Sequence, residues 1–127
     1  MLALSTKYAL KALLFLARNQ SEEFMLVRAL SEEAEVPGPY LSKIIKQLAA
    51  KQLVETRRGI LGGVRFPKNR PSITFYDVCV ALDDPIVSQG CFLTKHPCTT
   101  RSPCVMHSHW TRIKSEIAKF LQESKIE

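Results

Sequence analysis

Four side chains that bind soft metal ions lie close together in the last third of this chain. They form the pattern Cys91-x6-Cys98-x5-Cys104-x2-His107. Thiolate sulfur and imidazole nitrogen are the donors that zinc sites and iron–sulfur clusters use, and four such donors make one closed ligand set. The spacing therefore predicts a metal or cluster site with these four residues as its ligands.

The other cysteine and histidines have different expected roles. Cys79 lies in a short apolar run that is typical of a buried helix, so we expect it to pack in the core. His109 follows Cys104 by five residues and would point elsewhere on a helix, whereas His96 is a reserve ligand. A structural zinc site is the alternative to a cluster, although zinc sites more often contain Cys-x2-Cys pairs.

Composition and length narrow the class of protein. The chain has 127 residues, of which 46% are hydrophobic and 24% charged, as in an ordinary small globular domain. It has no apolar run long enough to cross a bilayer, and its first residues lack the pattern of a signal peptide, so we expect a cytoplasmic protein without a secretory leader or a membrane partner. It also lacks a nucleophile–base set and a phosphate-binding loop, so we do not expect an enzyme.

Positive charge is concentrated in the middle of the chain. The formal net charge is +6, and residues 40–70 alone carry eight Lys and Arg against the single acid Glu55. By contrast, residues 22–35 carry five Glu against Arg28. A basic block inside a foldable region is typical of a surface that binds the phosphates of nucleic acid.

Periodic apolar residues predict the elements that would position this basic block. We expect a buried helix over residues 6–18, a second helix over 27–34, and a third over 39–51 with its apolar stripe facing inward. The turn at 35–39 is tight, and Pro39 suits the first turn of the third helix. Two short helices joined by a tight turn, the second with a polar and basic outer face, predict a helix-turn-helix unit.

A hairpin is expected directly after the third helix. Residues 53–57 and 64–66 have the pattern of two strands, and the intervening turn contains Gly59, Gly62 and Gly63. A hairpin at this place makes a winged helix, and Arg58 at its tip could enter a minor groove. We therefore expect a mainly α fold with a small β-hairpin wing.

The remaining chain predicts a short helix at 75–82, a loop at 86–103 and a long final helix at 104–122. We expect three parts: a DNA-binding domain at 1–82, a ligand loop at 83–104 and a dimerisation helix at 105–127. The apolar stripe of the final helix predicts a homodimer that binds a pseudo-palindromic operator. The stripe consists of Trp110, Ile113, Ile117 and Phe120.

The candidate DNA contacts come from the third helix and the wing. Tyr40 is equally compatible with a packing role. The candidates are Pro39, Tyr40, Ser42, Lys43, Lys46, Arg57, Arg58 and Gly59.

Several of these motifs occur together in one known family. They are Val36-x3-Tyr40-Leu41-x2-Ile44, Leu53-Val54, Arg58-Gly59-x2-Gly62-Gly63 and the three cysteines 91, 98 and 104. With these motifs in this order, the chain resembles the iron–sulfur winged-helix repressors, the family that includes IscR and NsrR. The resemblance implies a homodimeric, DNA-binding transcriptional repressor that acts as a redox sensor through a cluster held by the loop cysteines.

The resemblance also bears on the fourth ligand. IscR-like members use a histidine three residues after the third cysteine, and His107 stands there. NsrR-like members can use an acidic residue of the first helix, but no Asp or Glu precedes Glu22. The resemblance therefore favours a 2Fe–2S cluster and leaves 4Fe–4S open. The alternatives are a zinc-stabilised winged-helix regulator and a metal- or redox-handling module without sequence-specific DNA binding.

Overall fold

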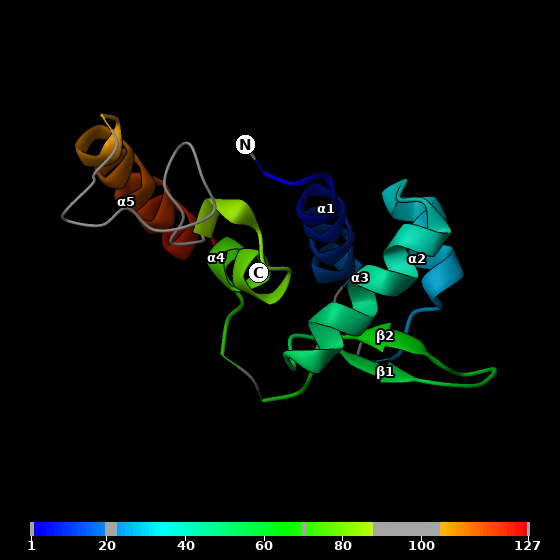
Figure 1. The fold of residues 1–127 in the computed structure, drawn as a ribbon. Coiled ribbons are helices and arrows are strands. Elements are labelled where there is room, and N and C mark those ends of the chain that lie inside the picture. The colour runs from blue at the N-terminus through cyan, green and yellow to red at the C-terminus, as the bar shows by residue number, and fades with distance from the viewer. Residues whose placement is uncertain (1, 20–22, 70, 88–104, 127) are drawn as a thin grey trace.

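The computed structural model describes residues 2–19, 23–69, 71–87 and 105–126. It confirms the expected fold class, a mainly helical chain with one two-stranded antiparallel hairpin (Figure 1). The elements in chain order are α1 (Leu4–Asn19), α2 (Val27–Ala34), α3 (Gly38–Ala50), β1 (Glu55–Arg57), β2 (Gly63–Arg65), α4 (Phe75–Ala81), the 3-10 helix η1 (Pro85–Val87) and α5 (His107–Glu123).

The core is built around α1, which contacts α2, α3 and α4. Small and aliphatic residues recur on most faces of α1, so this helix can be surrounded by other elements. Its buried residues are Thr6, Ala9, Leu10, Ala12, Leu13, Leu16 and Ala17. The inward stripe of α3 is the predicted one, and it consists of Leu41, Ile44, Ile45 and Leu48.

The turn between α2 and α3 determines how α3 is oriented relative to α2. Glu35 ends α2 in the left-handed conformation, with φ of 56°. The next residue, Val36, is buried in the core and its N–H bonds to the carbonyl of Ser31 at 3.0 Å. Pro37 then caps α3 and Pro39 lies in its first turn, where a missing N–H costs no helical hydrogen bond.

The wing, residues 55–65, is a tight hairpin, and a segment before α2 pairs with the outer edge of β2. Glu55 pairs with Arg65 across the hairpin, and Met25 forms an isolated bridge with Val64 on the other side of β2. Gly63 makes this approach possible: its φ is +139°, and a Cβ there would lie 1.9 Å from the carbonyl oxygen of Met25. β1 begins two residues later than the sequence predicts, whereas β2 has the predicted length and is shifted by one residue toward the N-terminus.

A buried carboxylate joins the start of α1 to the segment after α4. Asp84 is 1% exposed. One of its oxygens accepts from the Ala3 N–H at 2.9 Å and from the Thr6 hydroxyl at 2.6 Å, and the other accepts from the Ile86 N–H at 2.9 Å. Three donors satisfy the buried charge, so the contact holds η1 against α1.

Helix α5 packs against α4 and η1, on the side of the molecule away from α2 and the wing (Figure 1). It begins at His107, whereas the sequence predicts a start near residue 104. After it, the Ile126 N–H bonds to Ile73 at 2.9 Å, and the Phe75 N–H bonds to Ser124 at 2.8 Å. Ile126 is buried in the main core, so the end of α5 is tied to the base of the winged helix.

Candidate nucleic-acid interface and metal-ligand residues

The outer face of α3 is polar and basic. Because Leu41, Ile44, Ile45 and Leu48 point inward, the residues between them point to solvent. All eight predicted DNA contacts are exposed: Pro39, Tyr40, Ser42, Lys43, Lys46, Arg57, Arg58 and Gly59. The ring of Tyr40 also packs on Tyr8 of α1, with the two centroids 5.9 Å apart.

One groove brings α3 and the wing together. Ser42 and Lys46 line it from α3, and Arg57, Arg58 and Gly59 line it from the hairpin. The first residues around α2, Leu26 and Val27, complete one end. We call this the α3–wing groove; it gathers five of the eight predicted contacts, and Pro39, Tyr40 and Lys43 do not line it.

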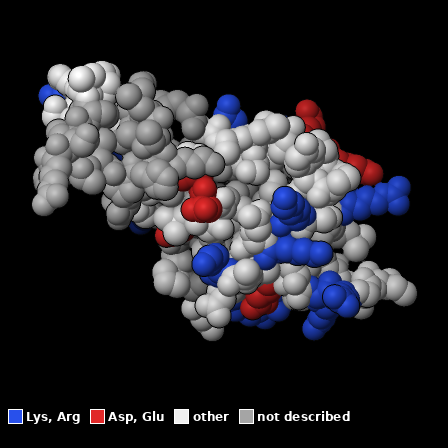
Figure 2. Space-filling model, in the orientation of Figure 1, with Lys and Arg blue, Asp and Glu red and all other residues white. Residues whose placement is uncertain are grey.

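Charge follows the same surface. Figure 2 shows Lys and Arg gathered over α3 and the wing, with fewer acidic side chains among them; the other acidic side chains lie toward α2 and toward α4. Among the exposed basic residues here are Lys43, Lys46, Arg58 and Lys68. Closely spaced cations release condensed counterions when they meet a phosphate backbone, so this face is suited to DNA.

An aromatic ring supports the basic side chains of the wing. The guanidinium of Arg57 lies 5.0 Å from the centroid of Phe24, and that of Arg65 lies 4.1 Å from it. Arg65 also donates to Glu55 at 3.0 Å. Stacking on a ring restricts where a guanidinium can point.

Local sequence patterns did not indicate the contacts of Phe24 and Arg65. Two usable signals were present: a single aromatic residue, Phe24, between the first two predicted helices, and one Arg in each strand of the hairpin. The bridge between Met25 and Val64, which places the ring beside β2, could not be inferred from local patterns.

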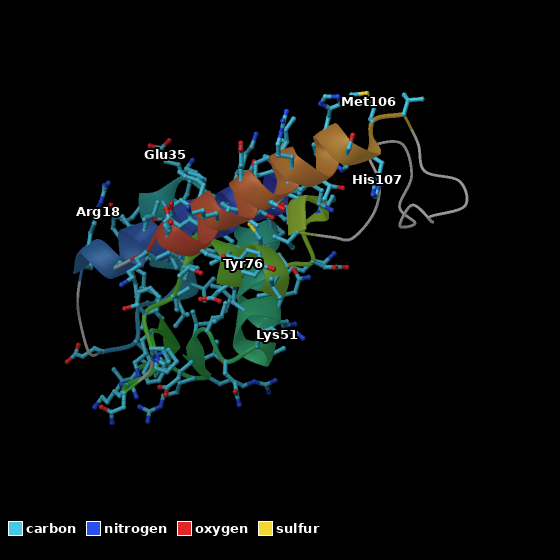
Figure 3. The ribbon with its side chains drawn as sticks, turned by 90° about the vertical axis from the view of Figure 1, so that its left-hand side faces the viewer. Arg18, Glu35, Lys51, Tyr76, Met106 and His107 are labelled. Carbon is cyan, nitrogen blue, oxygen red and sulfur yellow. The ribbon has the colours of Figure 1, made fainter. Side chains whose placement is uncertain are left out.

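Of the predicted metal ligands, the structure places only His107. Cys91, Cys98 and Cys104 lie outside the described residues, as does the reserve ligand His96. His107 is the first residue of α5, and its side chain is exposed at the same end of the helix as Met106 (Figure 3). Within the described ranges, no group of three or more His, Cys, Asp or Glu could hold a metal ion.

Cys79 is buried, as the sequence predicts. It is fully buried against Ile86 and Leu121. Burial, with a smaller effect of the nearby Asp84 carboxylate, raises the pKa of the Cys79 thiol to about 11. A thiol that stays protonated in an apolar site is a poor metal ligand.

The apolar stripe of α5 divides into two faces. Trp110 and Ile117 are partly buried and pack against the cluster of Cys79, Ile86 and Leu121 in the same chain. Ile113 and Phe120 instead remain 43% and 61% exposed. Together with Met106 they recur every seven residues, so they share one side of the helix.

None of the described helices is long and apolar enough to span a bilayer.

Comparisons with known proteins point to one family over the whole length. The family model of Rrf2, described as an iron-dependent transcriptional regulator, matches residues 2–127. A putative helix-turn-helix regulator of Aquifex aeolicus is 29% identical over 124 residues, which is 96% of this chain and 85% of that protein. The regulator IscR of Vibrio campbellii is 28% identical over 115 residues, covering 91% and 68%.

Solved structures show the same fold. The global cysteine regulator CymR of B. subtilis superposes with a TM-score of 0.77 at 20% identity, covering 99% of this chain and 92% of that one. T. potens IscR superposes with a TM-score of 0.74 at 21% identity, covering 99% and 82%. The winged-helix arrangement is thus shared with known regulators.

Proposed function

Because this chain belongs to the Rrf2 family of helix-turn-helix transcriptional regulators, we propose that it binds operator DNA as a homodimer under the control of an iron–sulfur cluster. Its relatives are regulators rather than enzymes. The observation that carries the DNA part of the proposal is the α3–wing groove, where Ser42 and Lys46 of α3 meet Arg57 and Arg58 of the wing.

In the proposed complex α3 lies in the major groove and the wing meets the adjacent minor groove. Ser42, Lys43 and Lys46 are exposed on one side of α3, so they can reach base edges and phosphates. Arg58 is exposed at the wing, where the negative potential of a narrow minor groove would attract it.

The proposed dimer forms through the outer side of α5. Met106, Ile113 and Phe120 present an apolar line that the chain's own core leaves exposed. Pairing two such lines would remove them from water, and an operator with half-sites one turn of DNA apart would require two copies of α3 about 34 Å apart. The proposed boundaries are residues 1–82 for DNA binding, 83–104 for the ligand loop and 105–127 for the dimerisation helix.

The proposed cluster is held by Cys91, Cys98, Cys104 and His107, with 2Fe–2S favoured. Three thiolates and one imidazole suit iron–sulfur chemistry, and the iron-dependent description of the family supports iron over zinc. When bound, the cluster would supply a redox-sensitive or iron-sensitive group. A zinc-stabilised regulator is the second candidate, because the same donors suit zinc.

Anaerobic purification followed by iron, sulfide and zinc analysis tests the cluster. We expect iron and acid-labile sulfide in wild-type protein and their loss in Cys104→Ala. The matched control is Cys79→Ala, which removes a buried thiol outside the ligand set and should keep the cluster. His107→Ala should leave a labile cluster. One zinc per chain without sulfide would instead establish the zinc-stabilised regulator.

Cluster control of DNA binding is tested with the same proteins. Operator affinity should differ between cluster-loaded and cluster-free wild type, and this difference should persist in Cys79→Ala and vanish in Cys104→Ala. Equal affinities of the two wild-type forms would show that DNA binding is independent of the cluster.

A further inference from the structure

The tip of the wing exposes two large apolar side chains. Ile60 is 93% exposed and Leu61 is 82% exposed, and Ile60 is the most exposed large hydrophobic residue in the described part of the chain. They form the corner of a β-turn, which the Gly62 N–H closes by bonding to the Gly59 carbonyl at 3.0 Å. Neither side chain belongs to the core clusters.

This placement is contrary to the usual chemistry of turns. Corner positions favour Gly, Asn, Asp, Ser and Pro, and a β-branched Ile gains nothing there by packing. Exposed neighbouring apolar side chains also carry a risk of aggregation. Residues that oppose local preference without a gain in folding are concentrated at functional sites.

The tip is held on a stiff base. Beneath it, β1 and β2 pair along their whole length, and Val64 exchanges two hydrogen bonds with Met25, of 2.8 Å and 2.9 Å. Phe24 stacks against Arg57 and Arg65 on the same hairpin. The turn therefore projects from the body at a defined angle (Figure 1).

Given the DNA-binding function proposed above, on which this inference rests, we propose that Ile60 and Leu61 enter a minor groove and pack against its deoxyribose walls. The flanking Arg57 and Arg58 provide the charge complementarity for an anionic partner. A minor groove is about 6 Å wide, which admits side chains at the corner of the turn rather than the hairpin itself. Apolar side chains, Ile and Leu among them, are used by other proteins to press into minor grooves.

The test begins with duplexes of about 30 base pairs, long enough for two half-sites, selected by the wild-type protein from random DNA. Failure to select any consensus would count against the proposed function, not against the tip. On a selected duplex, the double variant Ile60→Ser/Leu61→Ser should bind at least about tenfold more weakly, because the burial of two aliphatic side chains is lost.

The salt dependence separates this contact from phosphate contacts. The slope of log affinity against log salt should stay unchanged in the double variant, since no cation is removed. Val80→Ser, which removes an exposed apolar side chain of α4, is the matched control and should bind normally. Ile60→Val/Leu61→Met, which keeps apolar side chains, should retain affinity and so excludes a general defect of the turn.

Base substitution under the wing gives a second, independent measurement. Changing A·T pairs there to G·C adds an amino group to the floor of the minor groove. This change should weaken DNA binding by the wild-type protein but not by the double variant. Replacing guanine by inosine removes that group and should restore wild-type affinity. Unchanged affinity of the double variant overturns the proposal, as does a change in its oligomeric state with DNA binding intact, which would make the tip a protein contact.

Discussion

Asp84 shows how a single residue can hold together segments that are far apart in sequence. Its carboxylate accepts hydrogen bonds from Ala3, Thr6 and Ile86. Asp84→Asn replaces one acceptor by a donor facing other donors, so it should lower the free energy of unfolding by about 1–3 kcal/mol. Denaturant unfolding measures this.

The neighbouring residue provides the control for that substitution. Asp83 is exposed and has φ of 54°, a conformation that Asn tolerates as well as Asp. Asp83→Asn should therefore leave stability within about 0.5 kcal/mol of wild type. Equal losses in both variants would show that overall charge, rather than the buried contact, is responsible.

Two basic residues of the α3–wing groove should differ in what they contribute. Arg58→Ala should weaken operator binding by about 1–3 kcal/mol if the side chain is desolvated against base edges. Lys46→Ala should weaken binding to all DNA sequences alike. It should also reduce the slope of log affinity against log salt by about 0.9, the value for one phosphate contact. Lys119→Ala, on exposed α5, should change neither quantity.

Cys79 makes stability depend on alkaline pH. Burial in the folded state raises the pKa of its thiol to about 11, from an ordinary value of 9.0. The unfolded state therefore binds fewer protons between these two pH values. The contribution of the protonated thiol to folding stability is complete below about pH 9 and is lost as the pH rises toward 11. Thermal unfolding of wild type and Cys79→Ala across this range should show the steeper decline in wild type.

At the scale of elements, α5 has two apolar faces with different roles. Ile117 packs within the chain, whereas Ile113 and Phe120 face outward. Ile113→Asp/Phe120→Asp should therefore yield a folded monomer with weakened operator binding. Ile117→Asp should lower the unfolding temperature itself. Sedimentation with circular dichroism separates these cases, and a double variant that remains dimeric would place the interface elsewhere.

Elements with a strong local pattern were predictable from the sequence. The bounds of α2 agree with the expectation, and α3 and the wing agree to within about two residues, because apolar periodicity and turn glycines determine them locally. The inward stripe of α3, and hence its exposed basic side, followed from the same periodicity.

Features that depend on distant contacts were not predictable. The pairing of Thr74 with Lys125 and the stacking of Phe24 on Arg65 join segments more than forty residues apart. The division of the α5 stripe also required the structure, because periodicity shows that a face is apolar but not which partner covers it. The predicted cysteine ligands lie outside the described residues and stay a prediction.

At the scale of the whole molecule, the segment with the predicted ligands is connected to the DNA-binding side through packed elements. It lies in sequence between η1 and α5, and both of these pack on α4. Asp84 ties η1 to α1, and α1 packs on α3. These contacts form a continuous physical route by which the proposed cluster could affect α3.

The stacking of Arg57 and Arg65 on Phe24 has a kinetic consequence. A guanidinium already held in place loses little conformational freedom on binding, so the benefit should appear in the lifetime of the complex. Phe24→Leu should speed dissociation about two- to fivefold, the value of one cation–π contact. Association, which depends on long-range charge, should be unchanged, and Phe24→Tyr should behave as wild type. The Phe24→Leu protein would then leave its operator sooner than the wild type, although it would find the operator as quickly.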